Sequence, residues 1–112
     1  MTTEQQVNMR KMLDIMRDPN TRQCQHQYTS LDGSVCAYGC AFLATGRTDT
    51  DSTIWDVAEL CGFKMKDDNI GLSLPKLTYA GYTYSLYSLN DEEGLTLPVL
   101  ADLIEDQWLQ TL

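Results

Sequence analysis

The chain has 112 residues, of which 43% are hydrophobic and 21% charged, values typical of one globular domain with its own core. Lys and Arg number 8 against 16 Asp and Glu, and the net charge of -8 disfavours nucleic-acid binding and favours a basic protein partner. The N-terminus lacks the basic and apolar regions of a secretory signal, and no apolar run approaches the ~20 residues that span a bilayer. We therefore expect a single cytoplasmic domain over residues 1–112, with no membrane contact.

The first predicted element is a helix from Thr3 to Arg17. Apolar residues recur there at the spacing of one buried helical face, namely Met9, Met12, Leu13 and Met16. We expect Thr3 to cap this helix and Asp18 with Pro19 to end it.

Residues 22–30 alternate with the two-residue period of a strand. One predicted face carries Cys24, His26 and Tyr28, and the other carries Gln23, Gln25, Gln27 and Thr29. Asp32 and Gly33 follow with the dipeptide of a tight hairpin turn. We therefore predict a half-buried strand that pairs with Val35 and its neighbours across this turn.

Two helices are expected in the middle of the chain. Residues 35–44 are small and apolar on every side, which favours a buried helix ended by Gly46, although a strand at its start remains an alternative. Asp51 or Ser52 is expected to cap a further helix that runs through Leu60. Its inward face comprises Ile54, Val57, Ala58 and Cys61, and Gly62 ends it.

Residues 63–89 mix turn signals, at 67–69, 71 and 80–81, with β-branched and aromatic residues, which predicts short strands or a turn-rich excursion. The last helix is expected to begin at Thr96, with Pro98 in its first turn. Its predicted apolar face comprises Leu100, Leu103, Ile104 and Trp108. The predicted fold class is therefore α+β: a compact, mainly helical single domain with a short antiparallel hairpin and an amphipathic, acidic C-terminal helix.

Two blocks of the chain resemble those of small, uncharacterised phage and prophage proteins. Residues 32–43, DGSVCAYGCAFL, look like their cysteine-containing block after a hairpin turn. Residues 89–95, LNDEEGL, and 100–105, LADLIE, are similar to their C-terminal Leu-Asn-Asp segment and the acidic helix that follows it. The resemblance implies a phage origin and an α+β fold with a short hairpin, and it transfers no catalytic residue.

Four thiol and imidazole side chains suggest an alternative function. Cys24, His26, Cys36 and Cys40 have the atom types of a zinc site or of a thiol-dependent protein. However, Cys36 and Cys40 are one helical turn apart in apolar surroundings, where burial makes a thiol inert. We predict no metal, no cofactor and no enzymatic activity, and keep the zinc or thiol site as the alternative.

Charge along the chain is uneven, because the last basic residue is Lys76 and every charged residue after it is acidic. We predict a partner-binding surface made of tyrosines and carboxylates of the C-terminal third: Tyr82, Tyr84, Tyr87, Asp91, Glu92, Glu93, Asp102, Glu105 and Asp106. This requires the last helix to display Asp102, Glu105 and Asp106 outward on one face, free of internal ion pairs.

The leading hypothesis is a phage-encoded accessory protein that binds a host protein with a basic surface in the host cytoplasm and modulates or inhibits it. An alternative of a third class is a virion structural protein, or a homodimer, in which Trp108, Leu109 and Leu112 bury against another copy.

Overall fold

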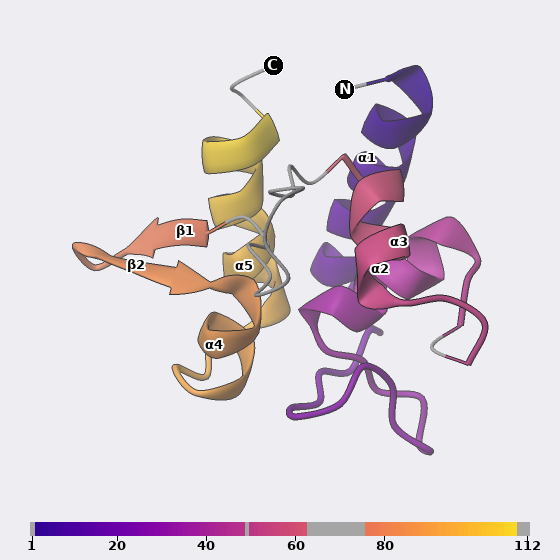
Figure 1. The fold of residues 1–112 in the computed structure, drawn as a ribbon. Helices are drawn as coiled ribbons and strands as arrows, with labels where there is room; N and C mark the ends of the chain where they lie inside the picture. Colours follow the sequence, from indigo (N-terminus) through magenta and orange to yellow (C-terminus); the bar gives the residue numbers. More distant parts are fainter. Residues whose placement is uncertain (1, 49, 63–75, 110–112) are drawn as a thin grey trace.

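Helix α1 (Thr3–Arg17) forms one side of the molecule, and α2 (Ala37–Thr45) and α3 (Ile54–Leu60) pack on it (Figure 1). The computed structural model describes three stretches of the chain, residues 2–48, 50–62 and 76–109. Helix α1 has the predicted bounds, and its predicted apolar face is buried in the core. The N-cap is Thr2 rather than Thr3, since the Thr2 side chain accepts from the Gln5 backbone N–H and Gln5 bonds back to Thr2.

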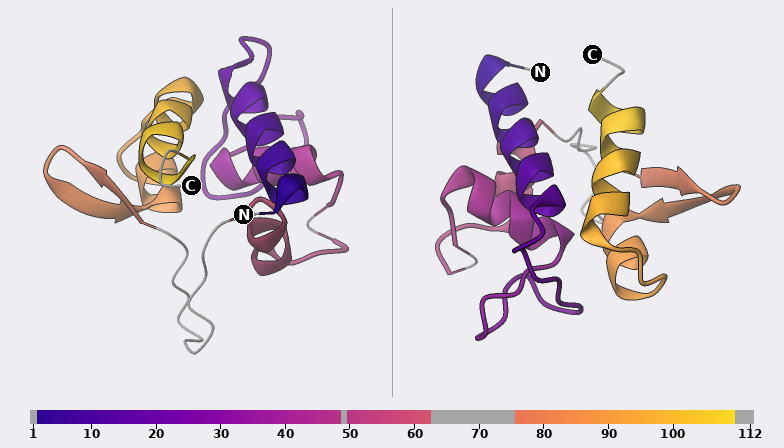
Figure 2. Two further views of the ribbon diagram at one scale, coloured as in Figure 1. Left: turned by 90° about the horizontal axis from the view of Figure 1, so that it is seen from above. Right: turned by 180° about the vertical axis from the view of Figure 1, so that it is seen from behind.

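The C-terminal third forms the other side of the molecule (Figure 2). Strands β1 (Lys76–Tyr79) and β2 (Tyr82–Ser85) form an antiparallel hairpin that projects beside α4 (Leu86–Asp91). Helix α5 (Leu97–Ile104) continues into a π-helical turn, η1 (Glu105–Leu109), and runs alongside α1. The α+β fold class with a short antiparallel hairpin is thereby confirmed.

The position of that hairpin differs from the prediction. Residues 22–30 form an irregular loop rather than a strand. Val35, which follows this loop, makes isolated β-bridges to two of its residues, Gln23 and Thr29. Gly33, at a φ of 86°, does make the predicted tight turn. The hairpin turn lies instead at Ala80 and Gly81, whose φ values of 53° and 85° suit a two-residue turn between strands of native twist.

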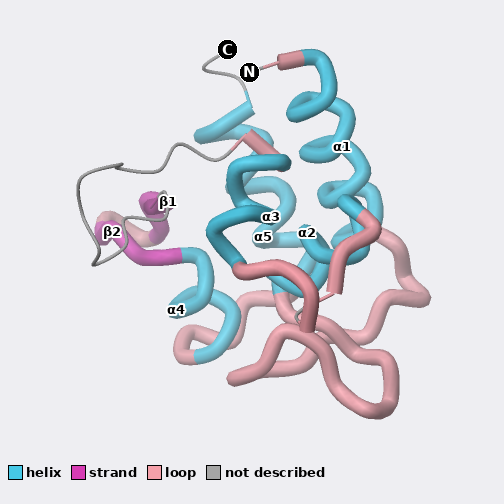
Figure 3. Tube along the Cα trace, turned by 45° about the vertical axis from the view of Figure 1, so that its right-hand side comes forward, coloured by secondary structure: helices cyan, strands magenta, loops and turns pink. Residues whose placement is uncertain are grey.

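Helix α2 confirms the predicted buried helix ended by Gly46, which takes a left-handed φ of 71°. Its N-cap is a cysteine, because the Cys36 sulfur accepts from the Gly39 backbone N–H over 3.4 Å. Gly39 also lies against the backbone of Tyr28, so closely that a Cβ would overlap the Tyr28 carbonyl oxygen. Glycine at this position therefore lets α2 pack on the 22–30 loop. Figure 3 draws the loops between α1 and α2 in pink.

Helix α3 begins later than predicted. Thr53 is its N-cap in a capping box with Asp56, so neither Asp51 nor Ser52 has that role. Val57, Ala58 and Cys61 are fully buried as expected, while the side chain of Ile54 lies outside the described part.

Short strands are confirmed at β1 and β2, but residues 86–91 form α4 where strands or turns were expected. Ser85 caps α4 by accepting from the Ser88 N–H, a short-range signal that the tyrosine-rich pattern obscured. The turn signals at 67–69 and 71 lie outside the described residues.

Helix α5 starts at the predicted place, with Thr96 at the N-cap position and Pro98 in the first turn. Its core face is buried, comprising Leu97, Leu100, Ala101 and Ile104, with Leu103 partly buried, while the side chain of Trp108 lies outside the described part. In the described part of the chain, no helix is both long and apolar enough to cross a membrane.

Candidate functional site

The nine residues predicted to bind a partner fall into two groups. One group lies on β2, α4 and the residues that follow it, and we call it the β2–α4 surface: Tyr82, Tyr84, Tyr87, Asp91, Glu92 and Glu93. The other lies on α5 and η1: Asp102, Glu105 and Asp106. Because the two groups differ in how their charges are compensated, they differ as candidate binding surfaces.

Two of the three carboxylates on α5 and η1, those of Asp102 and Glu105, are ion-paired, so the expectation of a helix face free of ion pairs was wrong for these two. The Arg17 guanidinium lies 2.8 Å from Asp102 Oδ1 and 3.2 Å from Glu105 Oε2, and it joins the end of α1 to α5. These hydrogen bonds raise the pKa of Arg17. Asp102 keeps 74% of its side chain exposed, but one cation already compensates part of this charge.

All three tyrosines of the predicted set lie on the β2–α4 surface, and two of them are exposed. Tyr82 is 69% exposed and Tyr87 is 53% exposed, fractions that are high for side chains of this size. Tyr84 is half-buried and packs edge-on against Tyr82, with ring centroids 6.5 Å apart. Burial and the nearby Glu93 carboxylate raise the pKa of Tyr84.

Glu92 and Glu93 follow α4 and are both exposed. Glu92 accepts a hydrogen bond of 3.1 Å from the Ser88 hydroxyl, which leaves its charge uncompensated. Among the residues whose positions are described, neither carboxylate has a Lys or Arg partner. The negative potential of the C-terminal third is therefore better preserved here than on α5.

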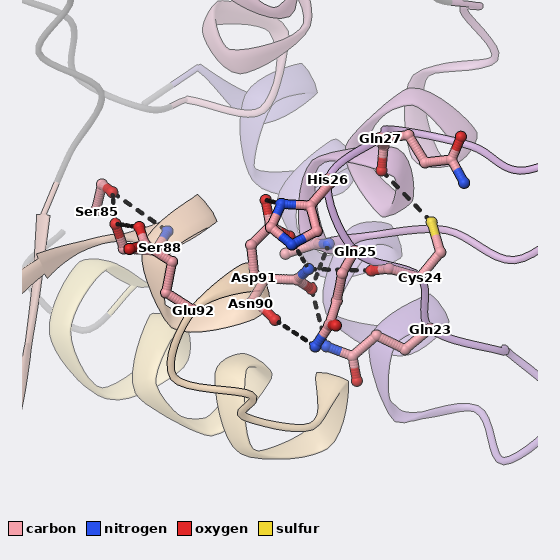
Figure 4. A network of polar contacts seen from close by, with 11 residues as sticks. Gln23, Cys24, Gln25, His26, Gln27, Ser85, Ser88, Asn90, Asp91 and Glu92 are labelled. Atoms are coloured by element: carbon pink, nitrogen blue, oxygen red, sulfur yellow. Dashed lines mark hydrogen bonds and ion pairs between the residues drawn. The ribbon is translucent and has the colours of Figure 1, made fainter.

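A cleft of about 450 Å³ lies between part of the 22–30 loop, the start of α2 and one face of α4. Its aromatic lining comes from Tyr28, Tyr38 and Tyr87, and its charged lining from Asp91. His26 lies at the same cleft, and its Nδ1 is 3.9 Å from Asp91 Oδ2. Figure 4 shows the two side chains next to each other. The structure thus brings together residues that the sequence assigned to two separate hypotheses.

Asn90 fixes the geometry of this cleft. It is fully buried, and its Oδ1 accepts from Gln23 Nε2 at 2.8 Å and from the Ala37 N–H at 3.2 Å. Its Nδ2 donates to the Cys24 carbonyl at 3.1 Å and to Asp91 Oδ1 at 2.6 Å. All four bonding sites of one side chain are used, so Asn90 holds the loop against α4.

The two faces predicted for residues 22–30 do not form. Gln23 is half-buried, and its amide also donates to the Leu95 carbonyl and accepts from the Leu97 N–H. His26, predicted to share a face with Cys24, keeps 74% of its side chain exposed and has a φ of 65°, whereas Cys24 is half-buried. The loop is therefore held by side-chain amides rather than by a strand ladder.

The proposed zinc or thiol site is not assembled. Among the residues that the structure describes, which include all four candidates, no three His, Cys, Asp or Glu side chains form a group able to hold a metal. Desolvation raises the pKa of Cys36 to about 11 and that of Cys40 to about 12, so both are protonated at neutral pH. Cys24 is half-buried, and its thiol donates to the Gln27 carbonyl.

Sequence reasoning missed three residues that shape this region: Arg17, Gly39 and Asn90. Arg17 and Asn90 have partners 85 and 67 positions away, so nothing local marks them. Gly39 is required by its contact with the backbone of Tyr28, which no local pattern indicates. The alternating glutamines were the available signal, and their amide groups supply the partners of Asn90 and of nearby backbone groups.

Comparisons with known proteins identify no relatives: no protein-family model, curated protein or solved structure matches the chain.

Proposed function

We propose that this chain is a protein-binding domain whose β2–α4 surface contacts a basic region of its partner. The observation that carries the proposal is the exposure of Tyr82 on β2 and Tyr87 on α4, the elements that lead directly to Glu92 and Glu93. These two carboxylates have no cationic partner among the described residues. Tyrosine supplies a large contact area at low entropic cost, and uncompensated carboxylates attract and orient a basic partner.

Binding is favoured over catalysis by the state of the thiols. A cysteine nucleophile must be an accessible thiolate, whereas Cys36 is buried and its pKa is raised to about 11. The resemblance of residues 32–43, 89–95 and 100–105 to phage proteins supports a host protein as the partner, bound in the host cytoplasm and modulated or inhibited there.

A peptide-display selection against the immobilised full chain tests the proposal without knowledge of the host. We expect the selected peptides to be rich in Arg and Lys and to lose affinity at 0.5 M salt, since exposed charges are screened within a few ångströms there. The double variant Tyr82→Ala/Tyr87→Ala should bind them at least tenfold more weakly.

Two charge-matched variants separate the acidic groups. Glu92→Gln/Glu93→Gln and Asp102→Asn/Glu105→Gln each remove two negative charges, but only the second pair is already compensated by Arg17. The first variant should weaken peptide binding more than the second. Peptides without basic residues, or equal binding by the tyrosine variant and the wild type, would refute the proposal.

A further inference from the structure

The cleft beside α4 has a chemistry more specific than that of an acidic surface. Three tyrosines line it, Tyr28, Tyr38 and Tyr87, together with a single carboxylate, that of Asp91. From this we infer that the cleft receives one arginine side chain of the partner, an inference that rests on the proposed function and names the group recognised by the β2–α4 surface.

The Asp91 carboxylate is held in a fixed orientation at the cleft and keeps one oxygen able to accept a hydrogen bond. Only 14% of the Asp91 side chain is exposed, so it lies within the wall of the cleft rather than in open solvent. Its Oδ1 is occupied by the 2.6 Å hydrogen bond from Asn90, which fixes the orientation of the group. Its Oδ2 lies 3.9 Å from His26 Nδ1, too far for a hydrogen bond, and so retains its capacity to accept one.

The lining disfavours anionic ligands. None of the described residues that line the cleft is Lys or Arg, so an anion would meet the Asp91 carboxylate without either cation to compensate it. The thiol of Cys36, which also lines the cleft, is neutral because of its raised pKa. Asp91 is therefore the carboxylate that a cationic side chain would pair with.

The aromatic walls favour arginine over lysine. A planar guanidinium stacks on aromatic faces while it donates to a carboxylate at its edge, and it is less strongly hydrated than an ammonium group. Tyr87 is 53% exposed and offers the most accessible ring, while Tyr28 is half-buried and packs on Phe42 with centroids 5.3 Å apart. The volume of about 450 Å³ is within the range of small-ligand sites.

The test is an NMR titration of the full chain with N-acetyl-arginine amide, with N-acetyl-citrulline amide as the neutral isostere. We expect saturable shifts of the Tyr87 and His26 ring signals with the arginine compound and at least tenfold weaker binding of the citrulline compound. Asp91→Asn should weaken arginine binding at least tenfold. Asp14→Asn removes the same charge from an exposed position on α1 and should leave arginine binding unchanged.

Equal binding of the two compounds, tighter binding of N-acetyl-lysine amide, or full affinity in Asp91→Asn would overturn the inference. If Asp91→Asn does not fold, Tyr87→Ala takes its place, because half of that side chain is already in solvent. The two proposals fail separately. Selected basic peptides that bind Asp91→Asn as tightly as wild type would remove the arginine site and leave the protein-binding function in place.

Discussion

Replacement of Asn90 by leucine should be among the most destabilising single changes on the surface of contact between the 22–30 loop and α4. The leucine side chain has similar volume but cannot donate or accept a hydrogen bond. Two backbone groups would lose their Asn90 partner: the buried Ala37 N–H and the half-buried Cys24 carbonyl. Gln23 would lose one of its two acceptors and keep the Leu95 carbonyl.

A buried group left without a partner costs ~1–3 kcal/mol, and the gain from burying leucine offsets part of that sum. We expect Asn90→Leu to lower the free energy of unfolding by about 3 kcal/mol, a large part of the ~5–15 kcal/mol typical of a domain. With a urea m-value of ~1.5 kcal/mol/M, the unfolding midpoint should fall by about 2 M.

Urea unfolding followed by circular dichroism measures this difference directly. Asn20→Leu is the matched control, since Asn20 is exposed and the change should stay within about 0.5 kcal/mol. A loss below about 1 kcal/mol for Asn90→Leu, or an equal loss in both variants, would refute the role given to the Asn90 side chain.

Three further predictions concern packing, thiols and pH. Gly39→Ala should lower the free energy of unfolding by more than ~2 kcal/mol, because the alanine Cβ would overlap the Tyr28 carbonyl oxygen. Thermal unfolding measures this change; a more stable variant, as expected from the higher helix propensity of alanine, would show that the contact is absent. Native protein at pH 8 should expose at most one thiol to a disulfide reagent, that of Cys24, and four after denaturation, since burial protects and raises the pKa of the others: Cys36, Cys40 and Cys61. Hydrogen bonds from Ser34 lower the pKa of Asp32 to about 2, so its stabilising contribution should be present above its unfolded pKa of 3.8 and vanish as the pH falls through 2; a stability difference between wild type and Asp32→Ala that does not shrink from pH 5 to pH 2 would count against it.

The helices that the sequence predicts well are those with a strong local pattern. The buried methionines of α1 recur at one regular helical spacing, so its bounds and its buried face follow from the sequence alone. Helix α2 is apolar throughout and ends at a glycine with the required positive φ. The N-caps of α1 and α3 were each misplaced by a residue or two, because neighbouring Thr, Ser and Asp residues have similar capping ability.

The predicted hairpin fails for a different reason. Both 22–35 and 76–85 have a turn dipeptide between segments of strand-like composition. Whether two such segments pair as strands depends on whether other parts of the chain offer hydrogen bonds to their backbone and side-chain amides. In the first segment Asn90 supplies those partners, so only isolated bridges form. The local sequence around residues 22–30 cannot indicate these hydrogen bonds, because Asn90 lies 65 to 67 positions further along the chain.

The candidate site was predicted in part. Sequence reasoning selected Tyr87 and Asp91, which line the cleft, and the exposed Tyr82. It also treated all C-terminal carboxylates alike, because the pairing of Arg17 with Asp102 spans 85 residues and follows only from the packing of α1 against α5. The charge asymmetry of the chain is therefore not the same as the charge distribution on its surface.

A chemical-shift map of the isotope-labelled chain with one selected basic peptide tests the binding surface most directly. If the β2–α4 surface binds the partner, amide shifts should concentrate in residues 82–93 and in the loop around His26. Shifts that concentrate on α5 and η1 around Asp102, or that spread without any preference for one region, would contradict the proposed surface.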